Sequence, residues 1–204
     1  MKVSVLDYQM GNIKSVTRKL DRLGAKWDII NDSSGISKAE KILLPGVGHF
    51  GRAMEYLEEK QLVNILNKKV LENNTPILGI CLGMQLMCSY SEEGNVKGLG
   101  WFDAKVERFK VKDTLRYKIP HTGWNATKIR NNQALMKENI DNEEFYFVHS
   151  YCVKSAPEDQ IMTTTNYETE FVSSLFKNNI YGVQFHPEKS HEVGEELIKN
   201  FLKI

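Results

Sequence analysis

A cysteine between two glycines stands where an apolar run of residues ends. Cys81 lies in the segment GICLGMQ (79–85), directly after the run PILGI (76–80). A cysteine that only fills a core needs no glycine neighbours. A nucleophile held on a sharp turn from strand to helix does need them, because small residues let the backbone bend and let a substrate approach. The segment therefore indicates a reactive thiol.

A histidine and a glutamate near the end of the chain could serve that thiol. His186 and Glu188 close the expected strand IYGVQFHPE (180–188), with Pro187 between them. Residues two apart in an extended segment point to the same side, and proline biases the residue before it toward that conformation. An imidazole oriented by a carboxylate is a common partner of a nucleophile. Cys81, His186 and Glu188 thus form a complete predicted triad.

An oxyanion formed on attack would need backbone donors, and two segments could supply them. The first is the N–H of Leu82, which follows the nucleophile, and the second is the glycine-rich turn PGVG (45–48) after another expected strand. The glycines beside Val47 permit a peptide flip in this turn at low steric cost. Each of these motifs also occurs in ordinary turns, and their joint position at the strand ends of one chain is what favours catalysis.

The elements that must position these residues alternate between strand and helix in the first half of the chain. Strands are expected at 2–8, 26–30, 41–46 and 76–81, and helices at 11–24, 50–74 and from 82 onward. This alternation predicts a parallel sheet with helices on both faces. In such a sheet, sites form beyond the carboxyl ends of the strands, which is where Cys81 lies.

The second half predicts strands joined by short polar turns. These strands are expected at 104–110, 122–129, 144–153, 161–167, 170–176 and 180–188, with a closing amphipathic helix at 191–204. The predicted fold class is therefore α/β, with an open, mainly parallel twisted sheet, helices on both faces and added antiparallel strands in the second half. We expect one domain, spanning residues 1–204.

Composition and charge exclude several functions. With 27 Lys and Arg against 26 Asp and Glu, the chain has no net field that would draw nucleic acid or an anionic membrane. No apolar run approaches the roughly 20 residues of a membrane helix. Three cysteines do not suggest a disulfide framework, and the expected location is a reducing cytoplasm. Cys88, expected in the helix after Cys81, and Cys152, expected in a strand, are interpreted as core residues. No metal-ligand spacing or phosphate loop is found, so neither a metal nor a cofactor is expected.

Several segments resemble a known family. GICLGMQ (79–85) and FHPEKS (185–190) are similar to motifs of the class I, or triad, glutamine amidotransferases. Four further segments resemble one branch of that family, the glutaminase subunits of imidazole glycerol phosphate synthases. They are DYQMGNIKS (7–15), PGVGHF (45–50), PHTGWN (120–125) and YFVHSY (146–151). The resemblance runs nearly end to end. It departs at Gln9, where glycine is usual, and at Thr122, where a larger apolar residue is common.

The resemblance implies a reaction and a set of site residues. The Cys81 thiol would attack the side-chain amide of glutamine, His186 would protonate the departing ammonia, and water would release glutamate from the thioester. The implied oxyanion donors are the N–H groups near Val47, Gly48 and Leu82. The implied substrate-binding residues are Gln85, Glu93, Tyr146, Ser150 and Tyr151. A substrate ammonium also needs a carboxylate nearby, which SEEG (91–94) offers, although a solvated helix end would account for the same residues.

The resemblance also implies a partner and no cofactor. The partner would be a (β/α)-barrel cyclase subunit in a heterodimer, and the chain shows no evident site of its own for a phosphorylated acceptor. Ammonia would pass to N′-(phosphoribulosylformimino)-aminoimidazole carboxamide ribotide, giving imidazole glycerol phosphate and aminoimidazole carboxamide ribotide in histidine biosynthesis. The implied partner-facing residues are Asn12, Trp124 and Lys189, while a place in the core is the alternative for Trp124.

Other functions would use the same residues. A paralogous glutaminase could feed ammonia to a barrel partner in surface-sugar biosynthesis. A stand-alone γ-glutamyl hydrolase would use the triad without a partner, and a binding module that kept the fold would not need the triad. Because unguarded release of ammonia wastes glutamine, we expect the chain alone to be a poor glutaminase that its partner accelerates.

Overall fold

The middle of the sheet is parallel, as the alternation of strands and helices predicts. The computed structural model describes residues 2–137 and 141–204. Its strand order there is β2 (Trp27–Ile30), β1 (Val3–Leu6), β3 (Ile42–Gly46), β4 (Ile77–Cys81) and β14 (Ile180–Val183). Every neighbouring pair in this series is parallel. The mainly parallel core of the predicted fold class is confirmed.

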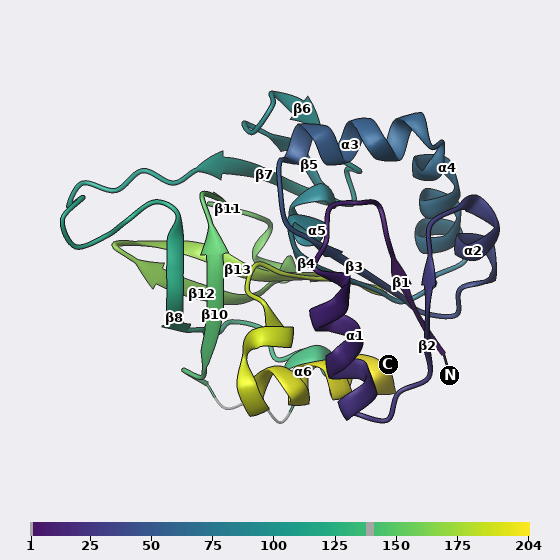
Figure 1. Ribbon diagram of the computed structural model, residues 1–204. Helices are drawn as coiled ribbons and strands as arrows, with labels where there is room; N and C mark the ends of the chain where they lie inside the picture. The colour runs from purple at the N-terminus through teal and green to yellow at the C-terminus, as the bar shows by residue number, and fades with distance from the viewer. Residues whose placement is uncertain (1, 138–140) are drawn as a thin grey trace.

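Antiparallel strands extend the sheet beyond β14 (Figure 1). They are β13 (Thr169–Lys177), β11 (Tyr151–Val153), β7 (Phe102–Arg108), β5 (Cys88–Ser91) and β6 (Val96–Lys97). On a branch from this series, β12 (Ile161–Tyr167) pairs with β13, and β9 (Lys128–Ile129) pairs with β12. One pair in this region, β5 with β7, is parallel. A separate antiparallel ribbon joins β8 (His121–Ala126) to β10 (Glu144–His149). The added antiparallel strands that the sequence predicts in the second half are thus confirmed.

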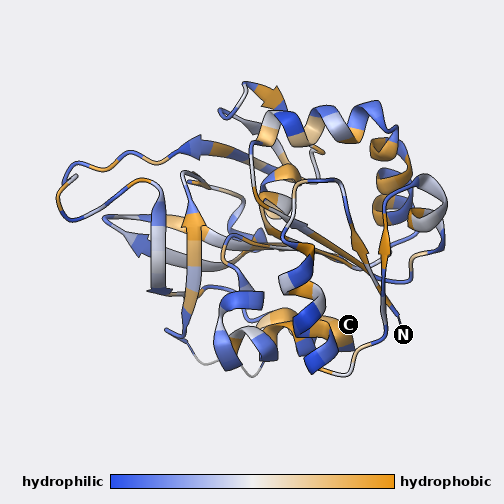
Figure 2. Cartoon of the chain, in the orientation of Figure 1, coloured by the Kyte–Doolittle hydropathy of each residue, from blue (hydrophilic) through white to orange (hydrophobic). Residues whose placement is uncertain are grey.

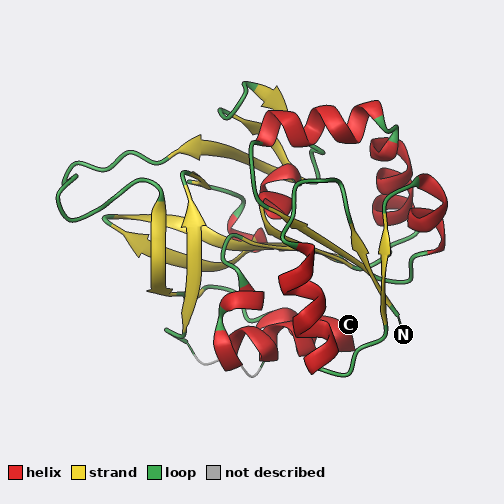
Figure 3. Ribbon diagram, viewed as in Figure 1, coloured by secondary structure: helices red, strands yellow, loops and turns green. Residues whose placement is uncertain are grey.

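Helices cover both faces of the parallel strands (Figure 3). One face carries α2 (Ser33–Lys38), α3 (Phe50–Glu59), α4 (Leu62–Asn67) and α5 (Leu82–Leu86). The other carries α1 (Ile13–Arg22) and α6 (His191–Lys203). Short helical turns complete the list: η1 (Lys68–Glu72), η2 (Ala134–Met136), η3 (Glu158–Gln160) and η4 (Pro187–Lys189). Within residues 2–137 and 141–204, no helix has the length and apolar character needed to cross a membrane.

Each face of the sheet builds its own core. Side chains alternate along a strand, so Ile42 and Leu44 of β3 belong to the same core as Leu57 of α3, while Leu43 belongs to the core that includes Phe201 of α6. The central strands are accordingly apolar throughout, and they stand out in orange in Figure 2. Burial on both faces is what fixes β3 and β4 rigidly, and these two strands end at the candidate site.

Two helices end earlier than the sequence predicts. The expected helix at 50–74 is interrupted at Gln61, whose φ of 55° is left-handed, so that α3 and α4 are separate helices. The expected helix after Cys81 is only α5, and Cys88 begins β5 rather than continuing it. The carbonyl of Met87 accepts hydrogen bonds from the N–H groups of Trp101 and Phe102, so sheet-like pairing with a later segment replaces the helix. The α2 helix was not expected.

Candidate active site

Cys81 occupies a strained turn between β4 and α5. Its φ of 54° and ψ of −108° lie where few residues other than glycine are found. The flanking glycines allow the turn, because a Cβ on Gly79 would collide with the backbone of Gly83, and a Cβ on Gly83 would collide with the carbonyl of Leu44. Backbone strain of this kind costs about 1–3 kcal/mol and concentrates at functional sites. The strand-to-helix turn expected around the thiol is present.

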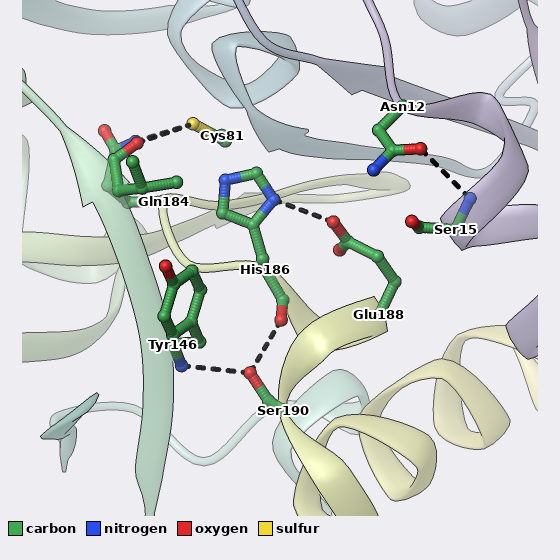
Figure 4. A network of polar contacts seen from close by, with 9 residues as sticks. Asn12, Ser15, Cys81, Tyr146, Gln184, His186, Glu188 and Ser190 are labelled. Carbon is green, nitrogen blue, oxygen red and sulfur yellow. Dashed lines mark hydrogen bonds and ion pairs between the residues drawn. The ribbon is translucent and has the colours of Figure 1, made fainter. Parts of the chain in front are cut away.

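The sheet order brings the end of β14 beside Cys81. Val183 of β14 pairs with Ile80 of β4, so the residues that follow each strand are neighbours. Beyond β14, His186 Nδ1 lies 2.8 Å from Glu188 Oε1, and both side chains are buried. Figure 4 shows the imidazole between Glu188 and Cys81. His186 Nε2 is buried without a hydrogen-bond partner in the described residues, which leaves it free to exchange a proton with the thiol or a substrate.

Charge at the site favours a protonated imidazole. Burial alone would lower the pKa of His186, but the charges of Cys81 and Glu188, with the hydrogen bond to Glu188, more than offset burial and raise the pKa above its ordinary value. The neighbouring His149 behaves in the opposite way, since burial lowers its pKa to about 3. One histidine next to the thiol is therefore positioned to hold a proton, and the other stays neutral.

A cavity of about 280 Å³ opens over the thiol. Of the residues expected in the site, its lining contains Cys81, Val47, Gly48, Leu82, Gln85, Glu93, Ser150 and Tyr151. Pro120, Val148 and His149 complete the lining, and none of these three was assigned to the site from sequence. A cavity of this size suits a small polar metabolite rather than a large ligand.

The turn at 45–48, hereafter the oxyanion turn after its expected role, has one of its expected donors bound elsewhere. The N–H of Val47 donates to the carbonyl of Met10 at 2.6 Å, so it is not available to an oxyanion in this state. Gly48 has a φ of 132°, a conformation that glycine tolerates and other residues rarely adopt. The N–H of Leu82, by contrast, is the first amide of α5 and has no acceptor within its own helix.

Two expected substrate-binding side chains already have protein partners. Gln85 Nε2 donates to the carbonyl of Tyr151 at 3.0 Å and to Gln184 Oε1 at 2.9 Å. Glu93 Oε2 accepts from the N–H of Phe50 at 2.8 Å, at the start of α3. Glu93 lies in a turn after β5, not at the end of the helix that follows Cys81. It therefore ties the cavity wall to the residues that follow the oxyanion turn.

The remaining expected residues lie on the surface near the site rather than in the cavity. Tyr146 is absent from the cavity lining; its ring lies 5.8 Å from that of Trp124 and 5.4 Å from Lys189 Nζ. Trp124 is 39% exposed and stacks on His191, so it is not a core residue. Asn12 caps α1 by accepting from the N–H of Ser15. A larger hollow of about 680 Å³ borders Trp124 and His191 and contains none of the triad.

One residue beside the thiol was missed in the sequence. Gln184 is fully buried, and its Nε2 donates to Cys81 Sγ at 3.5 Å. The strand expected at 180–188 ends at Val183 and Glu188 lies in η4, so alternation along a strand gave no signal for Gln184. Cys88 and Cys152 are buried, and burial raises the pKa of each to about 12, which agrees with their interpretation as core residues. Among the described residues, no group of three or more His, Cys, Asp or Glu could hold a metal ion.

Known proteins share both this sequence and this fold. The family described as "Glutamine amidotransferase class-I" matches residues 4–204. An imidazole glycerol phosphate synthase subunit HisH 2 of Methanococcus maripaludis is 49% identical over 201 residues, which cover 98% of both chains. A subunit of the same name from Pseudomonas aeruginosa is 40% identical over 202 residues, 99% of both chains. A crystal structure of glutamine amidotransferase superposes with a TM-score of 0.77 at 17% identity, covering 98% of this chain and 97% of that one, and shows the shared fold.

Proposed function

The chain belongs to the class I glutamine amidotransferases, and from this premise we propose that it is the glutaminase subunit of an imidazole glycerol phosphate synthase. It hydrolyses glutamine to glutamate and passes the ammonia to a (β/α)-barrel cyclase subunit. That subunit makes imidazole glycerol phosphate and aminoimidazole carboxamide ribotide in histidine biosynthesis. Support comes from the names of relatives that match the chain over nearly its whole length.

Cys81 is the nucleophile of the proposed reaction. Its sulfur attacks the side-chain carbonyl carbon of glutamine and forms a C–S bond, while the carbonyl electrons move to the oxygen. His186 then gives its proton to the amide nitrogen as the tetrahedral species collapses and the C–N bond breaks. The Glu188 carboxylate accepts from Nδ1 of His186 at 2.8 Å, which directs Nε2 toward the reacting atoms. Water activated by the same imidazole cleaves the thioester.

The substrate is held by the remaining polar groups of the cavity. Glu93 takes the α-ammonium, because it is the carboxylate in the cavity lining. The free carbonyl oxygen of Gln85 accepts from the substrate, since its Nε2 is engaged by Tyr151 and Gln184. Ser150 and Tyr151 also line the cavity. Tyr146, which lies outside the lining, is assigned to the partner face together with Asn12, Trp124 and Lys189.

The oxyanion turn controls the rate. Leu82 supplies one donor at once, but the N–H of Val47 must leave the carbonyl of Met10 before it can supply the second. The loss of one oxyanion donor lowers turnover by about 10²–10³-fold. The partner face is connected to this turn by a short stretch of chain, because Asn12 follows Met10 by two residues. It is connected to the triad through Lys189, which directly follows Glu188.

The observation that most supports this function is a set of three features around one 280 Å³ cavity. These are a cysteine with a φ of 54° and an oxyanion turn whose donor is withheld, both in the cavity lining, and a histidine bonded to a buried carboxylate, which lie outside the lining. A binding module would need none of them.

The test is the rate of glutamate release from glutamine under three conditions: the chain alone, the chain with the cyclase subunit, and the complex with an acceptor analogue. We expect a slow rate for the chain alone and acceleration of at least about a hundredfold in the loaded complex, because one oxyanion donor is restored. Cys81→Ala, measured under each condition, gives the background. Equal rates under all three conditions would contradict a partner-controlled glutaminase.

A second candidate is a glutaminase of the same kind that serves a barrel partner in surface-sugar biosynthesis. The observation that favours it is the numeral 2 in the names of the Methanococcus and Pseudomonas relatives, which implies a second subunit of this kind in one organism. The protein that co-purifies with the chain separates the two candidates. A barrel that cyclises the imidazole precursor supports the first, and a barrel that aminates a nucleotide-linked sugar supports the second.

A further inference from the structure

Gln184 lies beside the reactive sulfur although it is not part of the triad. It directly follows β14, and Cys81 ends the neighbouring strand β4. Its side chain has no exposed surface, and Nε2 lies 3.5 Å from Cys81 Sγ (Figure 4). A buried amide is placed this way only if its polar atoms find partners. Those partners determine which end of the amide faces the sulfur.

A chain of hydrogen bonds fixes the orientation of the Gln184 amide. The carbonyl of Tyr151 can only accept, so the atom of Gln85 that lies 3.0 Å from it is a nitrogen. The same nitrogen lies 2.9 Å from Gln184, which must therefore present its oxygen to Gln85. Its nitrogen is left facing the sulfur. If the Gln184 amide were flipped, its NH₂ group would face the NH₂ group of Gln85. The hydrogen bonds of the fold therefore require that Gln184 present its NH₂ group to Cys81.

Apart from the protonated His186, few groups could stabilise a charged sulfur at this position. Cys81 is 5% exposed, so water contributes little. The titratable neighbours are His186 after β14, Tyr8 after β1 and, beyond His186, His149 on β10. Burial and the Cys81 charge raise the pKa of Tyr8, and burial lowers that of His149, so both stay neutral. The carbonyl of Val148, 3.9 Å from Sγ, can accept a thiol proton but would repel a thiolate.

We infer that Gln184 is a catalytic residue whose amide donates a hydrogen bond to the Cys81 thiolate and so keeps the nucleophile ionised in a dry site. This inference rests on the proposed role of Cys81. Hydrogen bonds to charged acceptors are about twice as strong as neutral ones, so the bond favours the thiolate over the thiol. When the C–S bond forms, the charge moves to the oxyanion and the bond weakens. Gln184 therefore raises the fraction of reactive sulfur and does not speed the attack itself.

If Gln184 raises the fraction of ionised sulfur, its loss should change how the reactivity of Cys81 depends on pH. The loss of an amide with only a structural role would not change that dependence. Gln184→Met keeps the length of the side chain and removes the donor. At pH 6 to 7 its Cys81 should react about tenfold more slowly than the wild-type residue, which corresponds to a shift of about one pH unit in the reactivity profile. The difference between the two rates should shrink toward the alkaline end of the profile.

The probe is iodoacetamide on the isolated chain, without glutamine or partner, between pH 5.5 and 9.5. Cys81 and Cys88 share the tryptic peptide 70–97, so fragment ions must assign the modified residue. Gln184→Glu is the second variant, since it keeps the acceptor for Gln85 and replaces the donor to sulfur by a carboxylate oxygen. Its profile should shift upward further than that of Gln184→Met. It reports on the inference even if the methionine variant is poorly folded.

The matched control is Asn200→Leu, which removes a buried amide from α6, where Nδ2 donates to the carbonyl of Leu135 at 3.3 Å. It should lower the melting temperature and leave the Cys81 profile unchanged. If both Gln184 variants keep the wild-type profile while Cys81 stays reactive, the inference is wrong and the proposed function stands. If wild-type Cys81 reacts no faster than Cys88 and Cys152, both are overturned.

Discussion

At the scale of single residues, hydrogen bonds determine which ring nitrogens of the buried His149 and His121 carry protons. His149 Nδ1 lies 2.7 Å from the carbonyl of Tyr151, which can only accept, so Nδ1 carries the proton and Nε2 is an acceptor. His121 Nδ1, 3.1 Å from that Nε2, must then be the donor. His121 Nε2 lies 2.7 Å from Asn125 Oδ1, and because this nitrogen is then unprotonated, the Asn125 amide is assigned the flipped orientation, with its nitrogen donating to Nε2. The pair is thus built for two neutral imidazoles.

This pair should make the protein lose stability in mild acid. Burial lowers the pKa of His149 to about 3 and lowers that of His121, whereas an unfolded histidine titrates near pH ~6.5. Below that pH the two histidines bind protons in the unfolded chain but remain unprotonated in the folded chain. The free energy of unfolding should therefore be highest above pH ~6.5 and fall toward pH 3, by up to about 1.4 kcal/mol per pH unit for each histidine.

His149→Asn should make this loss shallower, and urea unfolding at pH 7.5, 6 and 5 would measure it. Asparagine can still donate to Tyr151 but takes up no proton when the chain unfolds. His191→Asn, which removes an exposed histidine, is the control. His186 does not confuse the result, because its raised pKa gives stability that is complete below pH ~6.5 and is lost only as the pH rises. Identical slopes for wild type and His149→Asn would contradict the assignment.

The three residues proposed as the triad were chosen from sequence by residue type and local spacing. The flanking glycines indicated Cys81, and the spacing around Pro187 indicated His186 and Glu188. Gln184 and His149 could not be assigned, since a glutamine just beyond a strand and a histidine within one have many uses. Only the partners that the fold brings to them, Cys81 and His121, reveal what they do.

At the scale of elements, the loop between β1 and α1 holds the oxyanion turn through Met10. The preceding residue, Gln9, has a φ of 63°, which explains why glycine is usual at this position. An L-residue in the left-handed region costs about 1–2 kcal/mol. The departure that the sequence showed at Gln9 is therefore local backbone strain in the element that restrains Val47.

Gln9→Gly should stabilise the protein. Relief of the strain is partly offset by the greater freedom of glycine in the unfolded chain, about 0.4–1 kcal/mol, so the net gain is about 0.5–1 kcal/mol. For a domain of this size, this corresponds to a rise of about 1–4 °C in melting temperature. Gln133→Gly, at an ordinary φ of −103°, should give no such gain. A lower melting temperature for Gln9→Gly would show that the loop is not strained.

Element boundaries were predicted least well where distant segments decide them. The pattern of apolar residues in 50–74 does not show the left-handed residue at Gln61 that divides α3 from α4. The short α5 ends because residues 101 and 102 bond to Met87, and no local signal in 82–90 foretells that pairing.

At the scale of the whole molecule, the layers could be predicted and the strand order could not. Alternating strands and helices predicted the parallel sheet and its two covered faces. The placement of β14, the last strand of the chain, directly beside β4 is a contact across about half of the sequence. Hydrophobic periodicity carries no information about such distant pairing. This contact is nevertheless what joins His186 to Cys81 and creates the site.

The division of labour between the chain and its partner gives the most direct test of the central claim, that Cys81 generates ammonia for a synthesis carried out elsewhere. The measurement is glutamate release by Cys81→Ala in complex with the cyclase subunit, beside product formation from added ammonium salt. Cys88→Ala, which removes a buried thiol outside the cavity lining, is the control and should keep the wild-type rate. We predict that Cys81→Ala loses glutamate release by at least about a thousandfold, keeps the wild-type melting temperature and still forms product from ammonium. Glutamate release at the wild-type rate from the folded variant would contradict the account.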